Sequence, residues 1–347
     1  MAGNSIGSVF KVTTWGESHG KALGVVIDGC PSNISLSEKD IQKEVDRRKP
    51  KDPRVSTTRK EEDKVEIMSG VFEGKTTGTP ISIVIFNKNV RSQDYKKLKS
   101  VYRPGHADFA YDLKYGIRDY RGGGRSSGRE TVARVAAGAV AKKVLNTNIY
   151  GHTVQVGDIF AKEFNKTEIG KNPLHCADKK AAKEMLSLVE KVRKEKDSIG
   201  AVIELVIENP PIGLGEPVFD KLNADLAKAL TSIGAVKGIE FGSGFDSAFL
   251  KGSENNDQMR ADKEENITYL SNNAGGISGG ISNGNPIVLR LAIKPTPSIA
   301  TKQKTITNLG KNTSIEVTGR HDTCLAPRVI PVAESMAAIV LADHLLR

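Results

Sequence analysis

The feature that most constrains this sequence is a glycine- and arginine-rich stretch, residues 120–130, which runs directly into a helical pattern. It reads YRGGGRSSGRE and contains three consecutive glycines. Glycines let the backbone adopt positive φ and approach a ligand closely, while arginine and serine side chains supply donors for phosphate or carboxylate oxygens. Residues 131–145 repeat apolar positions at helical spacing, so a helix N-terminus should point its N–H groups at the bound anion. The alternative is a Gly-rich surface turn before an ordinary core helix, and the density of arginine favours the anion site.

Other segments carry the periodicity of strands and helices. The pattern predicts strands at 6–15, 23–27, 81–86, 200–208, 235–241 and 287–293, and helices starting after Ser37 and at 178–196, 219–230 and 331–346. We expect the region 151–198 to be peripheral to the fold. Strands alternate irregularly with helices, which favours an α+β architecture over a regularly alternating parallel sheet.

The charge balance limits the class of partner. The chain has 347 residues and a formal net charge of +10 at pH 7. Such a positive field attracts either nucleic acid or a multiply charged small molecule. Aromatic residues make up only 5% of the chain, which disfavours nucleic acid because base stacking needs aromatic platforms. An RNA-binding protein that uses Arg121, Arg125 and the basic loop is the rival from a different class.

Cysteine usage and the N-terminus bear on the compartment. Cys30, Cys176 and Cys324 are widely spaced and lack metal-ligand spacing, so we expect neither a disulfide framework nor a metal site. A reducing cytosol fits this usage best. The N-terminus lacks the pattern of a signal peptide, and no apolar run approaches the length of a membrane span. We therefore expect a soluble cytoplasmic protein without a membrane partner.

Three short motifs place histidine beside other polar groups. They are GESHG at 16–20 with His19, RPGHAD at 103–108 with His106, and GRHD at 319–322 with Asp322. The first matches the esterase nucleophile elbow at Ser18, but that elbow precedes a helix and here a strand follows, so a hydrolase is disfavoured. A lone histidine is more often structural than catalytic, although His19 is suited to donate a proton from a loop tip. His106 comes shortly before the glycine stretch, so the fold can bring it to the same pocket.

A basic segment at 49–63 admits two interpretations. It is rich in proline and charge, follows Arg48 and contains Arg54. Such composition is typical of a solvated, mobile loop. The same segment is also suited to act as an arginine flap that folds over an anion and excludes water.

Together these motifs resemble the chorismate synthase family. The resemblance is carried, in family order, by residues 16–20, 103–108, 121–130, 275–284, 294–296 and 319–324, and so covers nearly the whole chain. The chain departs from the family pattern at Phe109, Asn273, Ser278 and Thr323. None of these four departures removes a group that we assign to chemistry.

The resemblance implies a fold and a reaction. The reaction is the anti-1,4-elimination of phosphate from 5-enolpyruvylshikimate 3-phosphate to give chorismate, the last step of the shikimate pathway, and it requires reduced FMN without net redox change. The fold is a single domain over residues 1–347, a β-α-β sandwich with helices between two antiparallel sheets, assembled as a homotetramer. By similarity, FMN should contact Arg125, Ser126, Ser127, Gly234, Ala235, Gly279, Lys294, Pro295, Thr296, Pro297, Ser298 and Arg320.

The expected ligands concentrate negative charge. Two carboxylates and a phosphate beside a flavin phosphate need neutralising, and we expect the arginines to do this because a guanidinium grips such oxygens bidentately. The candidates are Arg48, Arg54, Arg103 and Arg129. In a second interpretation, Arg48 and Arg54 hold NADP and the protein also reduces flavin. Because the family motifs already occupy the whole chain, we expect an external source of reduced flavin.

The resemblance also suggests three roles in the reaction. His106 is the acid toward the leaving phosphate, His19 is the proton donor to the reduced flavin, and Asp322 is the base that assists flavin N5. All three roles need pKa values tuned by burial and by neighbouring charges.

Overall fold

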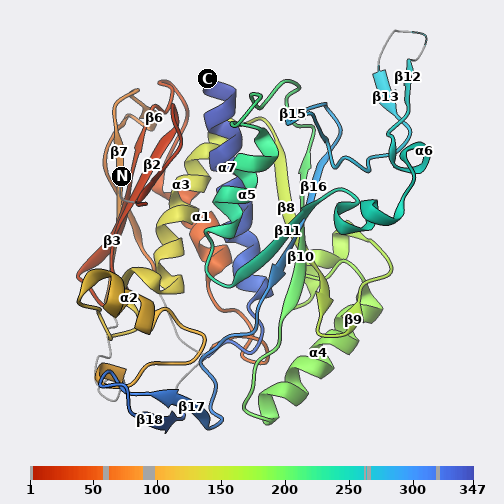
Figure 1. Ribbon diagram of the computed structural model, residues 1–347. Helices are drawn as coiled ribbons and strands as arrows, with labels where there is room; N and C mark the ends of the chain where they lie inside the picture. The colour runs from red at the N-terminus through yellow and green to blue at the C-terminus, as the bar shows by residue number, and fades with distance from the viewer. Residues whose placement is uncertain (1–2, 58–61, 89–97, 262, 264–266, 318–320) are drawn as a thin grey trace.

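The computed structural model describes residues 3–57, 62–88, 98–261, 263, 267–317 and 321–347, and it places helices between two five-stranded antiparallel sheets (Figure 1). The predicted α+β sandwich is confirmed. The first sheet has the order β1 (Ser5–Ile6), β2 (Lys11–Gly16), β3 (Ala22–Asp28), β7 (Ile81–Phe86), β4 (Val65–Ser69). The second has the order β11 (Val236–Phe241), β16 (Ile287–Ile293), β10 (Ala201–Glu208), β8 (Asn148–Val156), β9 (Ile159–Phe160).

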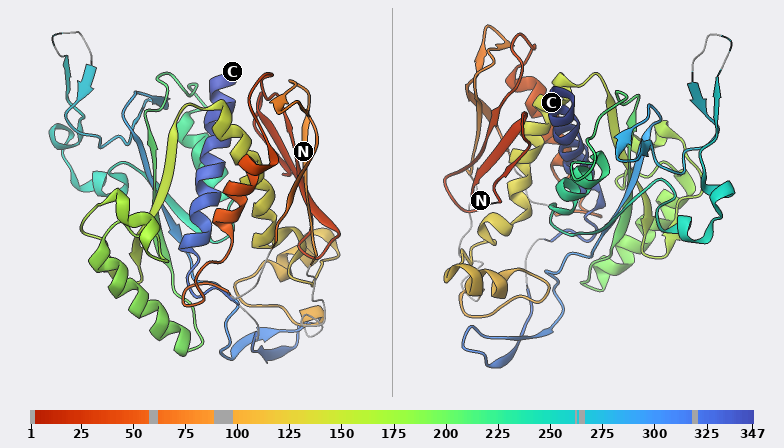
Figure 2. Two further views of the ribbon diagram at one scale, coloured as in Figure 1. Left: turned by 180° about the vertical axis from the view of Figure 1, so that it is seen from behind. Right: turned by 45° about the horizontal axis from the view of Figure 1, so that its top comes forward.

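Helices fill the space between the two sheets (Figure 2). They are α1 (Glu38–Arg48), α3 (Thr131–Val144), α5 (Leu222–Thr231) and α7 (Ala326–Leu346). Helix α3 packs on β2, β3 and β7 and α1 packs on β4, while α7 packs on β8 and β10 and α5 packs on β11. The helices therefore bury one face of each sheet.

The remaining elements lie around this sandwich. They are α2 (Asp108–Tyr115), α4 (Lys179–Lys194), α6 (Gly252–Asn255) and the strand pairs β5 (Val71–Phe72) with β6 (Lys75–Thr76), β12 (Met259–Ala261) with β13 (Ile267–Tyr269), β14 (Ile277–Ser278) with β15 (Ile281–Ser282), and β17 (Gln303–Ile306) with β18 (Asn312–Ile315). The hairpin of β12 and β13 projects away from the sandwich (Figure 1).

The core follows from the sequence pattern. Along β7, Ile81, Ile83 and Ile85 point inward and are fully buried, as expected for alternation in a half-buried strand. The two central helices approach closely at Gly138 of α3, where an added Cβ would overlap Ser335 of α7. Small residues on α3 thus permit the tight packing of α3 against α7.

The expectation that no apolar segment approaches the length of a membrane span is wrong for helix α7, which is long and apolar enough by length and composition alone. In this fold 89% of its most apolar window is buried inside the protein. It forms the central core helix of the sandwich.

Several boundaries differ from the prediction. Helix α7 begins five residues earlier than expected, at Ala326, because Pro327 occupies its first turn and Pro331 lies inside the helix. The expectation that 151–198 is peripheral is wrong for β8, which pairs with β10 along its length and contacts α7. The helix expected at 219–230 begins at Leu222. The helix expected after Ser37 is confirmed as α1, and Ser37 caps it in a reciprocal capping box with Asp40.

Candidate active site

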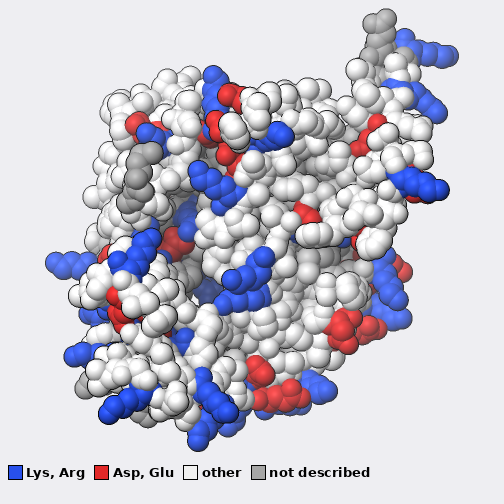
Figure 3. All heavy atoms as spheres, in the orientation of Figure 1, with Lys and Arg blue, Asp and Glu red and all other residues white. Residues whose placement is uncertain are grey.

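Most of the predicted site residues that the structure describes lie on loops that contact one another at one end of the sandwich. Lys294, after β16, donates its backbone N–H to Ala235 O at 2.9 Å and its Nζ to Gly105 O at 2.8 Å. Arg134 in the first turns of α3 donates to Ser232 Oγ at 2.7 Å. On the surface, a hollow with basic side chains around it opens between the parts of the molecule over α2 and α5 (Figure 3).

The glycine stretch lies where the two histidine motifs meet. Gly122, Gly123 and Gly124 all adopt positive φ, of 69°, 88° and 55°, which confirms the conformational reason for three glycines. A Cβ at Gly122 would overlap the ring of His19, and one at Gly123 would lie 3.6 Å from Arg103 Nη2. The loop therefore joins the surroundings of His19 to those of Arg103.

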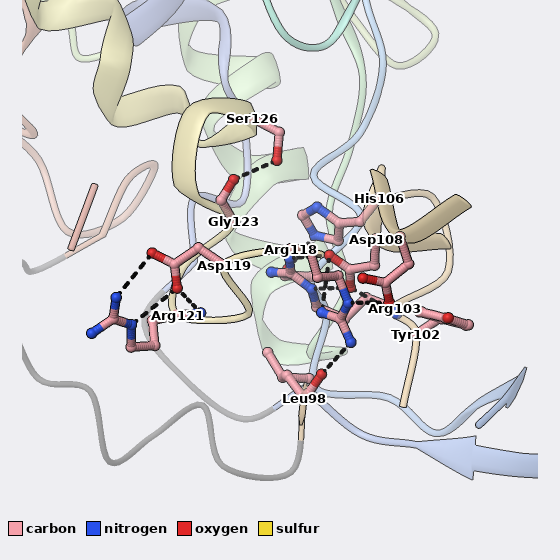
Figure 4. Close-up of polar contacts among 12 residues, drawn as sticks. Leu98, Tyr102, Arg103, His106, Asp108, Arg118, Asp119, Arg121, Gly123 and Ser126 are labelled. Carbon is pink, nitrogen blue, oxygen red and sulfur yellow. Dashed lines mark hydrogen bonds and ion pairs between the residues drawn. The ribbon is translucent and has the colours of Figure 1, made fainter. Parts of the chain in front are cut away.

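His106 sits above an ion-pair cluster, as Figure 4 shows. Its Nε2 lies 2.7 Å from Ser298 Oγ. Below it, Arg103 grips Asp108 through Nε at 2.8 Å and Nη2 at 2.7 Å, and Arg118 Nη1 lies 3.8 Å from the same carboxylate. The carboxylate of Asp108 thus fixes the guanidinium group of Arg103 beneath the imidazole, while Arg118 is held by Asp112 and Leu98 O.

The cluster makes His106 a weak base in the free protein. Burial, then Arg103 and Lys294, lower the pKa of His106 to about 4, and Asp108 opposes this only partly. Burial and Arg103 likewise lower the pKa of the neighbouring His321. His321 Nε2 is buried and has no hydrogen-bond partner among the described residues. Both imidazoles are therefore neutral at pH 7.

His19 lies on the tight loop between β2 and β3. It is buried, and its Nδ1 lies 3.0 Å from Ser18 Oγ. Because strand β3 follows the loop, Ser18 is not on a strand-to-helix elbow, and the hydrolase interpretation is excluded on that ground.

Two of the predicted anion-binding arginines share one buried carboxylate. Asp63 is fully buried, with Arg48 Nη2 at 3.0 Å from one oxygen and Arg129 Nη1 at 2.8 Å from the other. Burial alone would raise the pKa of Asp63, but the two guanidinium groups outweigh it and hold the pKa below its usual value. One aspartate balances two arginines here, which leaves the cluster with a net positive charge.

The glycine loop's own polar groups are turned inward. Arg125 donates to Thr14 Oγ1 at 2.8 Å and to Gly16 O at 3.2 Å, so it holds the loop against β2. Ser126 Oγ donates to Gly123 O at 2.7 Å, and Ser127 Oγ accepts from Arg129 N at 3.3 Å. These contacts shape the loop, and a direct contact from these three residues to a cofactor stays a prediction.

The other residues predicted to contact FMN lie in two separate regions of the structure. Gly234 and Ala235 adjoin the 294–298 segment, in which Pro297 packs against Gly105 and Thr296 Oγ1 is buried without a hydrogen-bond partner among the described residues. Pro295 packs against Gly200. Gly279 precedes Gly280, which lies against Lys221 and Leu222 at the other end of α5, about 15 Å away by helix rise. Arg320 lies outside the described residues.

Asp322 and Arg54 are engaged on the protein itself. Asp322 accepts from Thr57 N at 2.9 Å and from Arg328 Nη1 at 2.9 Å. Arg54 is half-exposed and pairs with Asp52 at 2.6 Å. The described part of the basic segment is docked, since Val55 O accepts N–H groups from residues 323 and 324. Residues 58–61 of the predicted flap lie outside the described residues.

Three polar residues near the site were not assigned by sequence reasoning. His321 stands beside Asp322 in the GRHD motif, and that adjacency was a usable signal. Asp63 and Asn87 carry no such signal, because their partners are distant in the sequence. Asn87 bridges Arg129 and the loop that carries His19.

Comparison with known proteins gives a single family. A family model described as chorismate synthase matches residues 10–346. A chorismate synthase of Methanosarcina mazei is 54% identical over 355 aligned residues, covering 100% of this chain and 97% of that protein. A chorismate synthase of Synechocystis sp. is 51% identical, covering 99% of this chain and 98% of that protein. A solved structure described as a crystal structure of chorismate synthase aligns with a TM-score of 0.78 at 32% identity, covering 98% of this chain and 93% of that chain.

Proposed function

The chain belongs to the chorismate synthase family, and from this premise we propose how its residues divide the work of the reaction. The enzyme is a phosphate-eliminating lyase that converts 5-enolpyruvylshikimate 3-phosphate into chorismate, the last step of the shikimate pathway. One observation supports the location that we propose for the reaction: His106, Ser298 and Arg103 lie close together beside the glycine loop.

Substrate binding is assigned to arginines that are already held in place. Arg103 is fixed by Asp108, and Arg48 and Arg129 are fixed by Asp63. The guanidinium groups of these arginines need little reorganisation to bind phosphate or carboxylate oxygens, because the side chains have lost their conformational freedom before the substrate binds. Arg54 joins this set only if its exposed pair with Asp52 opens.

The residues at the pocket fit a bound FMN. Gly234 leaves open space where a Cβ would stand, Thr296 Oγ1 is a buried hydroxyl without a partner among the described residues, and Lys294 offers a cation. Lys294, Thr296 and Ser298 would hold the cofactor's polar groups, with Arg320 as a further candidate. Reduced FMN would supply electron density as the phosphate leaves and would take up the hydrogen.

His106 holds the proton that the leaving phosphate needs. In the free protein its pKa of about 4 keeps the ring neutral at pH 7. A phosphate dianion bound beside it adds negative charge and raises that pKa, so the imidazole takes up a proton as substrate binds. Ser298 Oγ, at 2.7 Å, fixes the position of His106 Nε2 for this transfer.

His19 and Asp322 are placed on the cofactor side of the reaction. The Ser18 hydroxyl orients the imidazole of His19 through Nδ1, which suits a proton donor at a loop tip. Asp322 serves as a base only in competition with Thr57 N–H and Arg328, which already occupy its oxygens.

The setting of the enzyme completes the proposal. We place it in the cytoplasm as a homotetramer of single-domain protomers, using an external source of reduced flavin. The open surroundings of Gly279 are compatible with a neighbouring protomer.

NADP binding by Arg48 and Arg54 is the second candidate function, and an anaerobic NADPH oxidation assay tests it. The RNA-binding rival has no structural support, since Arg125 is engaged by β2 and Arg121 by Asp119.

The test is an anaerobic incubation with the enolpyruvyl substrate and dithionite-reduced FMN, following phosphate release and chorismate absorbance. Alanine at His106 or His19 should lower turnover about 10²- to 10⁴-fold, the usual worth of a general acid or base. FMN affinity, measured by flavin fluorescence, should change little. The control is His152→Ala, since His152 pairs with Glu204 on the second sheet. Near-normal turnover in either variant would remove that histidine from the mechanism.

A further inference from the structure

Asn87 follows β7 and its side chain makes three hydrogen bonds. Its Nδ2 donates to Glu17 O at 3.1 Å and to Gly20 O at 2.9 Å, and its Oδ1 accepts from Arg129 Nε at 2.8 Å. Its backbone N–H also donates to Lys21 O at 3.0 Å. Both hydrogens of the carboxamide and its oxygen are therefore used, which gives the group one defined orientation.

The two donors hold the carbonyl groups of Glu17 and Gly20, on either side of His19 in its loop. That loop is closed by a turn in which Gly20 N donates to Glu17 O at 3.1 Å, and it contains the buried pair Ser18 and His19. The ring of His19 fills the space where a Cβ on Gly122 would stand. A shift of the loop therefore moves the imidazole against the glycine stretch.

The Oδ1 atom of Asn87 accepts a hydrogen bond from Arg129. Arg129 donates Nε to Asn87 and pairs through Nη1 with Asp63, which also pairs with Arg48. The side chain of Asp63 is fully buried and that of Arg129 nearly so. One neutral amide thus connects a buried arginine cluster to the histidine loop.

We propose that Asn87 is a positioning residue for the chorismate synthase reaction, which fixes the His19 loop relative to Arg129. This inference rests on the proposed roles of His19 and Arg129. We assign Asn87 no contact with substrate or cofactor. Its effect on the reaction passes through the placement of His19, so it should alter turnover more than affinity.

Asn87→Asp is the most informative substitution. It keeps an oxygen that accepts from Arg129, and it replaces the Nδ2 donor with a second oxygen, which repels the carbonyl oxygens of Glu17 and Gly20. Displacement of a reacting group by about 1 Å costs on the order of 10²-fold in rate, so kcat should fall by about that factor. The new carboxylate also offsets positive charge at Arg129, so KM should rise, and the positioning role is therefore read from kcat at saturating substrate. Should Asn87→Asp not fold, Asn87→Ala removes the clamp without adding charge and serves the same test.

The chain offers a matched control at Asn172. Its Nδ2 donates to Glu168 O at 2.9 Å and to Cys176 O at 2.7 Å, and its Oδ1 accepts from Cys176 N at 3.0 Å. Asn172→Asp therefore breaks a loop clamp of the same chemistry before α4, outside the site. We expect a similar loss of thermal stability in both variants, with kcat unchanged in Asn172→Asp. Equal losses of kcat in the two variants would overturn the proposal.

A double-mutant cycle separates this inference from the proposed function. If Asn87 acts through His19, adding Asn87→Ala to His19→Ala should slow the enzyme no further, because groups that act as a unit are non-additive. Additive losses would overturn the positioning role while leaving His19 in the mechanism. Near-normal turnover of His19→Ala alone would instead sink the role of His19 and, with it, this inference.

Discussion

At the scale of single residues, the surroundings of His106 make a prediction about pH and stability. Its pKa falls from 6.5 in the unfolded chain to about 4 in the folded protein, so between these values the unfolded state binds a proton that the folded state does not. The folded state is then favoured above pH 6.5 and loses this contribution as pH falls toward 4. At 1.36 kcal/mol per pKa unit, the loss is about 3 kcal/mol.

Urea unfolding of the wild type and of His106→Gln at pH 7 and pH 4.5 measures this contribution. The variant should show a smaller drop in the free energy of unfolding over that range. His321 and His175, whose pKa values burial also lowers, remain in both proteins. The difference between the two drops therefore belongs to His106, and parallel drops would contradict the lowered pKa.

Residue-level prediction from sequence works where partners share a motif. Arg103, His106 and Asp108 occupy one hexapeptide, so their clustering could be foreseen. Asn87 could not be foreseen in this way. It is the first of several polar residues after an apolar strand, and its partners Glu17, Gly20 and Arg129 reach it only through the fold.

At the scale of elements, Glu334 joins four elements of the sandwich. It is fully buried in α7 and accepts from Arg47 of α1 at 2.7 Å, from Lys142 of α3 at 3.0 Å and from the backbone N–H of Gly151 in β8 at 3.1 Å. Arg47 and Lys142 also pair with Glu44, at 2.8 Å and 2.7 Å, so each cation keeps one carboxylate when Glu334 is neutralised. Removing one partner of a buried ion pair still costs about 3 kcal/mol.

Glu334→Gln should therefore lower the free energy of unfolding by about 3 kcal/mol, as urea denaturation would measure. The matched control is Glu208→Gln, because Glu208 pairs with Lys166 at the surface. An exposed pair of this kind is worth about 0.5 kcal/mol. Equal decreases in the free energy of unfolding of the two variants would mean that the buried network stabilises the fold no more than the surface ion pair does.

The elements that sequence located best are those with an unbroken pattern. The predicted strands 81–86 and 287–293 match β7 and β16 because runs of isoleucine, valine and leucine have no competing interpretation. Strand β8 was missed because Gly151 and His152 interrupt it, and what makes it a strand is pairing with β10. The early start of α7 was missed because a proline inside a helix looks like a boundary.

At the scale of the whole molecule, strand β2 connects the two ends of the sandwich. Its N-terminal approach is held by Asp343 of α7, whose Oδ1 accepts from the backbone N–H groups of Ser8, Val9 and Phe10 at 2.7–2.8 Å. Its other end leads into the His19 loop, about 20 Å away by strand rise over six residues. Stability and chemistry therefore depend on opposite ends of one strand.

Asp343→Ala should weaken the fold without changing the site. It removes three hydrogen bonds to a charged acceptor and the 2.8 Å pair with Arg347, so the free energy of unfolding should fall by about 3 kcal/mol or more. Amide exchange of residues 8–16 should quicken, since their anchor on α7 is gone. Asp28→Ala, which removes an exposed turn contact to Gly29 N, should leave both quantities nearly unchanged.

At a temperature where Asp343→Ala is fully folded, its kcat should equal that of the wild type, because Asn87 and Gly122 still hold the His19 loop. A lowered kcat under those conditions would show that the two ends of β2 are coupled, and that the position of His19 depends on the packing of the whole sandwich.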